Sequence, residues 1–130
     1  MGGHKLVSVK SRIGQGSFRR ELLDLYGINC AISGPAPKEA IHACHLYSYS
    51  KLGRHEEGGG ILLRSDLHAL FDSGLVKINP DSQEIAIDPE LRKFSQYWNL
   101  NHTPLKINLS SSQKYWLKIH WDQFSSEVPN

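Results

Sequence analysis

The sequence predicts an α+β protein built around a strand, a long loop, a second strand and a helix. The two strand candidates are the short apolar runs AIHACHL, residues 40–46, and GILLRS, residues 60–65. A long polar segment separates them, and the second run leads directly into SDLHALFDSG, residues 65–74, which has helical spacing. Helical segments near both ends and one hairpin pattern complete the α+β assignment.

The N-terminal part predicts a helix over residues 17–27. Ser17 can cap this helix and Gly27 is a natural stop. The alternation in residues 5–13 could form a short strand before it, and INCAIS, residues 28–33, is a short apolar run of β type. GPAPKE is a loop by its glycine and prolines.

The helix after the second strand is expected to begin with Ser65 as its N-cap and to stop before Gly74. Its apolar side chains would bury one side. Residues 75–88 hold two alternating runs around Pro-Asp-Ser, which predicts a hairpin, and residues 110–124 predict an amphipathic helix after a serine cap.

Length and composition favour one domain, residues 1–130. The chain has no apolar run of the roughly 20 residues that span a bilayer, and its start lacks the apolar centre of a signal peptide, so we expect a cytoplasmic protein. Cys30 and Cys44 are too few for a four-cysteine zinc site, although a mixed Cys/His zinc site stays open.

The net charge of +2 does not itself indicate nucleic acid. Residues 1–64 carry nine Lys and Arg against five acids, whereas residues 65–130 carry six against eight. Basic character therefore lies in the half that enters the strand–loop–strand unit, as a phosphate-binding face would require, although an unevenly charged solvated surface would look the same.

Histidines gather in and around this unit. Along a strand, His42 and Cys44 should point one way and His45 the other, while His68 and Asp72 share one face of the following helix. A helix packed across the hairpin would bring His68 to the strand that carries His45. One imidazole could then bind a metal and the other act as a base, although any single one could be a packed histidine.

The spacing resembles the HNH endonuclease superfamily. ACHL, then Gly59 fourteen residues after His45 and His68 nine residues further, within GGILLRSDLHALFDSGL, is similar to bacterial restriction-type HNH domains with AAHI, NGLLLRADLHALFD and LFDxG signatures. Upstream, GQGSFRRELLDLYGINCAISG resembles their GQxxFRxxLLxxYxxxCAxTG stretch. The resemblance covers about residues 12–80, with a motif core of about 40–74.

The resemblance implies a ββα-metal (His-Me finger) core, here with an N-terminal helix, an added β-hairpin and a C-terminal helix. It implies that His45 is the general base that activates water and that His68 binds one divalent cation, Mg²⁺ or Mn²⁺ before Zn²⁺ or Ni²⁺. The expected reaction is hydrolysis of a DNA phosphodiester bond to 5′-phosphate and 3′-hydroxyl ends.

Three positions depart from the family pattern. Gly59 stands where the motif has an Asn that braces the loop carrying the base, so another group must do this. Cys44 stands where many members have a metal ligand, and because a thiolate prefers Zn²⁺ to Mg²⁺, we expect His42 to join His68 as a ligand, with Asp72 in reserve. Ser48 replaces a frequent Pro.

Basic residues near the motif are candidates for DNA contacts: Arg64, Arg54, Lys51, Arg19 and Arg20. Such contacts position a duplex without reading its sequence. Double-stranded DNA is therefore the expected partner, with a homodimer or a separate targeting domain as further expectations. The alternatives are a DNA-binding module of the same fold without catalysis, motivated by Gly59, and a structural zinc module that uses Cys30, Cys44 and histidines.

Overall fold

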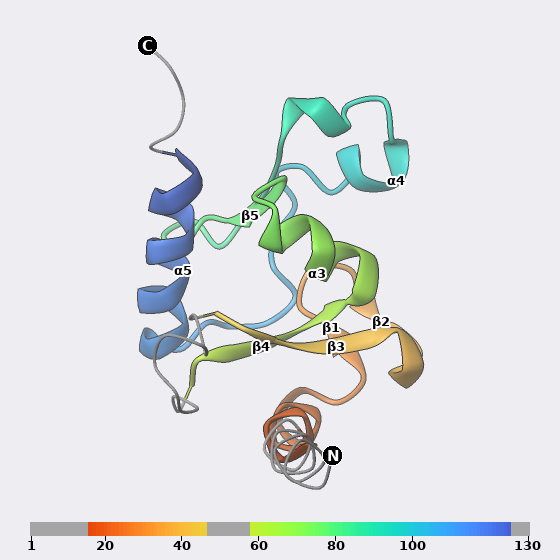
Figure 1. Cartoon of the computed structure of the whole chain (residues 1–130), viewed down its shortest axis with the longest axis vertical. Helices are drawn as coiled ribbons and strands as arrows, with labels where there is room; N and C mark the ends of the chain where they lie inside the picture. The colour runs from red at the N-terminus through yellow and green to blue at the C-terminus, as the bar shows by residue number, and fades with distance from the viewer. Residues whose placement is uncertain (1–15, 47–57, 126–130) are drawn as a thin grey trace, which may run out of the picture.

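The computed structural model describes residues 16–46 and 58–125 (Figure 1). Within them, three two-stranded antiparallel sheets are combined with helices, so the α+β class is confirmed. The strand expected at residues 5–13 lies outside the described residues.

The central element is a ribbon of β3 (Ile41–His45) and β4 (Gly60–Arg64), whose register places His45 opposite Gly60. The first four residues of β4 are buried, which fits their apolar sequence. Helix α3 (Ser65–Asp72) follows β4 without a linker and packs against both strands. The predicted strand–strand–helix order is therefore present.

Two details of the predicted helix ends are wrong. Arg64, in extended conformation, is the N-cap of α3 and makes no side-chain cap bond, so Ser65 is already the first helical residue. Ser17 lies inside a helix that includes residues 16–26. Gly27 does end that helix, with a φ of 70° and an amide that donates to Leu23.

The two faces of the ribbon are covered by different elements. Phe18 and Leu22 of the helix at residues 16–26 pack with Ile41 and Leu62 on one face. The other face joins the main core beneath α3, with buried residues Cys30, Ala31, Ile32, Cys44, Leu46, Ile61, Leu63, Leu67, Phe71, Val76, Ile78, Ile85, Ile87, Leu91 and Leu117. Figure 1 shows the orange helix and green α3 on opposite sides of the ribbon.

The strand formed by residues 28–33 is shorter than the sequence predicts. Strand β1 (Asn29–Cys30) turns back at once into β2 (Gly34–Pro35), and a short 3-10 helix, η1 (Lys38–Ala40), leads into β3. The Ala31 amide donates to Leu62 at 2.8 Å, so this turn satisfies part of the outer edge of β4.

The C-terminal half surrounds the core. The predicted hairpin is found as β5 (Val76–Ile78) and β6 (Ile85–Ile87), followed by η2 (Pro89–Leu91), α4 (Ser95–Trp98) and α5 (Ser111–Ser125). Helix α5 inserts its fully buried Leu117 into the core. None of the helices in the described ranges is long and apolar enough to cross a membrane.

Candidate functional site

Two histidines from different elements meet at the surface. His42 of β3 and His68 of α3 bring their Nδ1 atoms to 3.0 Å, with their rings in an edge-on arrangement. Position 42 faces α3 because β3 alternates its side chains, and His68 lies one turn into the helix that follows β4. The two residues expected as ligands are therefore in contact, and their role in metal binding stays a prediction.

Asp72 and Cys44 lie next to this pair. The second ring nitrogen of His68, Nε2, is 3.3 Å from Asp72 Oδ2, one helical turn further along α3. One potential ligand atom each of Cys44, His68 and Asp72 lies within 4.8 Å of the other two. Cys44 is fully buried, whereas the Asp72 side chain is 64% exposed. His42 contacts His68 but does not belong to this group of three, so His68 is the residue that the two sets share.

The protonation states separate these candidates. Burial lowers the pKa of His68, and the nearby His42 lowers it further against the opposing effect of Asp72, so the neutral, metal-competent imidazole is favoured. Burial, with a smaller effect of Asp72, raises the pKa of Cys44 far above its ordinary value. Cys44 therefore stays a neutral thiol, which is a poor ligand for a hard cation.

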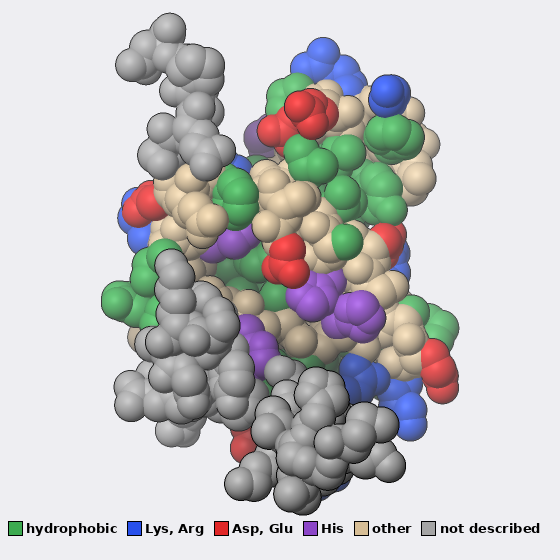
Figure 2. Space-filling view, viewed as in Figure 1, with side chains coloured by type: hydrophobic (Ala, Val, Ile, Leu, Met, Phe, Trp, Pro, Cys, Tyr) green, Lys and Arg blue, Asp and Glu red, His purple; other side chains and the backbone are tan. Residues whose placement is uncertain are grey.

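An open hollow of about 340 Å³ adjoins the histidine pair. Its lining residues are Gly16, Arg19, His42, Ala43 and His68. The Arg19 guanidinium donates to the carbonyl oxygens of Ile41 and Lys38, the latter at 2.8 Å, and these bonds fix it at the edge of the hollow. Figure 2 shows histidine side chains on this face between an acidic side chain and a group of basic ones.

His45 lies apart from this hollow. Its ring stacks on Phe18 of the helix at residues 16–26, with centroids 4.0 Å apart and planes inclined by 5°. Cys44, the preceding residue, belongs to the core on the α3 side. The strand alternation therefore separates the predicted base from the predicted metal ligands, and His45 is not among the residues that line the hollow with His42 and His68.

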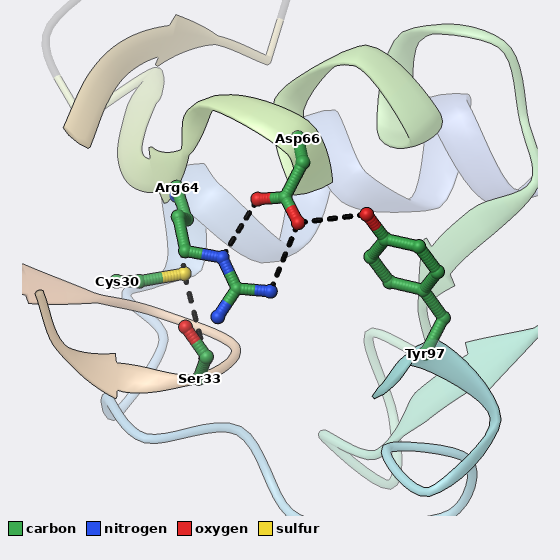
Figure 3. A network of polar contacts seen from close by, with 5 residues as sticks. All are labelled: Cys30, Ser33, Arg64, Asp66 and Tyr97. Atoms are coloured by element: carbon green, nitrogen blue, oxygen red, sulfur yellow. Dashed lines mark hydrogen bonds and ion pairs between the residues drawn. The ribbon is translucent and has the colours of Figure 1, made fainter. Parts of the chain in front are cut away.

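Arg64, a predicted DNA contact, takes part in a polar network within the protein (Figure 3). Its guanidinium binds Asp66 through two bonds of 2.7 and 3.0 Å, and the Tyr97 hydroxyl donates to the same carboxylate at 2.8 Å. The hydrogen bond from Arg64 lowers the pKa of Asp66 to about 2, with help from Tyr97. This network joins the end of β4 to α3 and α4.

The other basic candidates have different surroundings. Arg20 is exposed on the N-terminal helix, whereas Lys51 and Arg54 lie outside the described residues. Phe18, against the His45 ring, and Gln113, which reaches β4 from α5, were not predicted as site residues. A Ser-x-x-Gln pattern marks the start of α5, but it does not reveal that the glutamine contacts another element.

Comparison with known families supports the sequence motif. Residues 30–79 match the family model described as HNH endonuclease. This segment belongs to the HNH endonuclease superfamily. The HNH segment contains β3, β4, α3 and β5, and so includes His42, His68 and Asp72. No match to the chain was found among the curated proteins. The family assignment implies nuclease activity on DNA.

Pairs of donor atoms in the HNH segment are spaced as two ligands of one divalent cation would be. Ligand atoms that share one ion lie about 3 to 3.5 Å apart, given bonds of about 2.1 Å. The separations of 3.0 Å between His42 Nδ1 and His68 Nδ1 and of 3.3 Å between His68 Nε2 and Asp72 Oδ2 each fall in this range. They use opposite nitrogens of the His68 ring, so in this arrangement one ion can bridge either pair but not all three residues. Two imidazoles and a carboxylate are also donors that divalent metals accept.

Proposed function

We propose that the protein is a divalent-metal-dependent endonuclease that hydrolyses phosphodiester bonds of double-stranded DNA to 5′-phosphate and 3′-hydroxyl ends. The observation that carries the proposal is the pairing of His42 with His68 at an open hollow edged by Arg19, with Asp72 beside His68, within the segment that matches the HNH family. A site that is open and supplied with a cation-binding cluster and a guanidinium suits a large anionic substrate.

His42 and His68 would hold the cation, with Asp72 in reserve because it lies at the other nitrogen of the His68 ring. The cation would supply charge stabilisation at the scissile phosphate and at the departing oxygen. The mixed nitrogen and oxygen donors suit Mn²⁺ as well as Mg²⁺, with Zn²⁺ and Ni²⁺ as further candidates. Cys44 would contribute only with a soft metal, because burial keeps its thiol protonated.

Arg19 would bind a DNA phosphate. Its Nη1 and Nη2 atoms already donate to two backbone carbonyls, and a guanidinium carries five N–H donors in all. The remaining donors and the full positive charge are available at the edge of the hollow. Arg20, exposed one residue further, would extend this contact along the backbone of the duplex.

His45 would take the proton from the attacking water. Its stack on Phe18 fixes the plane of the ring at the end of β3, and the residue is only partly buried. His42 is the second candidate for this role because it is exposed and lies in the hollow itself. Removal of the general base and removal of a metal ligand can be distinguished. A higher metal concentration restores nuclease activity only when a metal ligand has been removed.

Nicking of supercoiled plasmid tests the proposal. Purified protein should relax the plasmid with Mn²⁺ or Mg²⁺ and not with chelator, and His68→Ala should abolish this. We expect excess metal to restore part of the activity of His42→Ala but none of that of His45→Ala. His102→Asn is the matched control, because His102 is exposed with a φ of 67° that Asn tolerates.

The second candidate is a DNA-binding module without catalysis. Its specific support is the glycine at position 59 and the separation of His45 from the hollow. Wild-type protein that binds duplex DNA but never nicks it with Mg²⁺, Mn²⁺, Zn²⁺ or Ni²⁺ would establish this alternative and refute the nuclease.

A further inference from the structure

The strand end that carries His45 is paired with a segment that has no side chains of its own. His45 lies opposite Gly60, and the next pair is joined by the Leu46 amide, which donates to the Gly59 carbonyl at 2.9 Å. Gly58 precedes them with a φ of 73°. Because glycine has the largest backbone freedom, the geometry of Gly58–Gly60 must be fixed from outside.

Helix α5 supplies that contact. Gln113 is only 2% exposed, and its Nε2 atom donates to the Gly60 carbonyl at 3.0 Å. The first turn of α5 also approaches Gly58 so closely that a Cβ there would lie 2.9 Å from Ser112 Cβ. Figure 1 shows the start of α5 beside the start of β4.

The Gln113 carboxamide has partners at both ends, which fixes its orientation. Its oxygen accepts from the Ser110 amide at 2.9 Å, and its nitrogen donates to the Tyr26 hydroxyl at 3.0 Å as well as to Gly60. A carbonyl can only accept and a backbone amide can only donate, so the nitrogen must face Gly60. The side chain links α5, β4 and the N-terminal helix.

A capping role explains only half of these bonds. Ser110 and Gln113 form a reciprocal capping box, since the backbone amide of Gln113 also donates to Ser110 Oγ at 3.1 Å. A glutamate would serve that box equally well, because the box uses only the acceptor end of the side chain. The two Nε2 bonds require an amide and lie outside the box, in a buried site where a lost donor is costly.

We propose that Gln113 is a positioning residue that holds the Gly58–Gly60 backbone and, through its pairing, the strand end bearing His45. This inference rests on the proposed function, in which His45 is the base. Gln113 thus provides a bracing amide from α5, in a chain whose motif position 59 has no side chain. It touches neither the substrate nor the metal ligands.

Two variants separate bracing from capping. Gln113→Glu keeps the acceptor for Ser110 and removes the donors to Gly60, whereas Ser110→Ala weakens the cap and keeps the amide. Activity is measured as plasmid nicking well below the melting temperature of each variant. We expect Gln113→Glu to lower kcat by about 10- to 100-fold with KM changed less than about threefold, and Ser110→Ala to leave kcat within about twofold.

Hydrogen exchange provides a readout that needs no activity. Gln113→Glu should speed exchange of the Leu46 amide about tenfold or more relative to amides of β5, and Ser110→Ala should not. If Gln113→Glu does not fold, the neutral variant Gln113→Met takes its place. It also removes the acceptor for the Ser110 amide, so its deciding readout is the exchange of Leu46 relative to β5, with the same expected increase.

The outcomes are distinct. Equal loss of kcat in Gln113→Glu and Ser110→Ala, or unchanged Leu46 exchange in Gln113→Glu, overturns the positioning role. If wild-type protein does not nick DNA, the proposed function fails, and exchange of Leu46 alone then decides whether Gln113 holds the strand end.

Discussion

Replacing Gly60 by alanine should disturb the side of the ribbon that bears His45. A Cβ at position 60 would lie 2.6 Å from Phe18 Cε1 and 3.2 Å from Leu22 Cδ1, with the Phe18 Cζ closer still. The ring of Phe18 stacks on His45, so it has neighbours on both sides. The absence of a side chain at position 60 therefore makes the space that the phenyl ring occupies.

The loss of folding stability in Gly60→Ala follows from the distance that the Phe18 ring must move. Carbon atoms in contact lie about 3.5–4.0 Å apart, so the ring must move by about 1 Å, and overpacking of this size costs about 1–3 kcal/mol. Phe18→Ala alone removes a buried ring and should cost about 3 kcal/mol, near the low end because its cluster is small. In the double variant the clash is gone, so its cost should fall about 1–2 kcal/mol below the sum of the single costs.

Urea denaturation of the wild type, the two single variants and the double variant completes this cycle. Ala86→Ser, partly buried on β6 and outside the cluster of Phe18, serves as a control whose effect should add to that of Phe18→Ala. Costs of Gly60→Ala and Phe18→Ala that add within about 0.5 kcal/mol would refute the reasoning, because they would mean that the methyl group does not meet the ring.

Three further predictions concern charge and metal. Asp66 has a pKa of about 2, below its ordinary value, so its pairing stabilises the folded protein above pH 4 and this stability is lost as the pH falls toward 2. Denaturation at several pH values should show that the free energy of unfolding of Asp66→Asn varies with pH by about 1 kcal/mol less than that of the wild type, after allowance for solvent screening. His120 is largely buried, and burial lowers its pKa, so stability should fall as pH drops below about 6.5; His120→Gln should flatten this slope, and an unchanged slope would exclude His120 as its source. In calorimetric Mn²⁺ titrations, His42→Ala should weaken binding by about tenfold or more and Cys44→Ser by less than about threefold; the opposite ranking would give the ligand role to Cys44.

The sequence predicted those parts of the fold that depend on local pattern. The apolar run of β4, the helical spacing of α3 and the Pro-Asp-Ser turn each encode their own conformation, and all three elements are present. The meeting of His42 and His68 also follows from local rules, because strand alternation and a helix directly after β4 leave few other arrangements.

Long-range contacts were not predictable in the same way. Arg64 was expected to meet phosphate, but its guanidinium binds the carboxylate of Asp66 two residues away, which also accepts from the Tyr97 hydroxyl of α4. The stack of Phe18 on His45 depends on how the N-terminal helix crosses the ribbon, which no spacing in either segment indicates. The bond from Gln113 to Gly60 joins positions 53 residues apart.

The two-sided covering of the ribbon bears on where this domain can be cut. The matched segment, residues 30–79, excludes Phe18 and Arg19 before it and Leu117 after it. A fragment trimmed to the match would expose Leu62 on one side, leave the main core open on the other and lose a guanidinium from the rim of the hollow. The smallest unit that can fold and act therefore extends well past the recognisable motif in both directions.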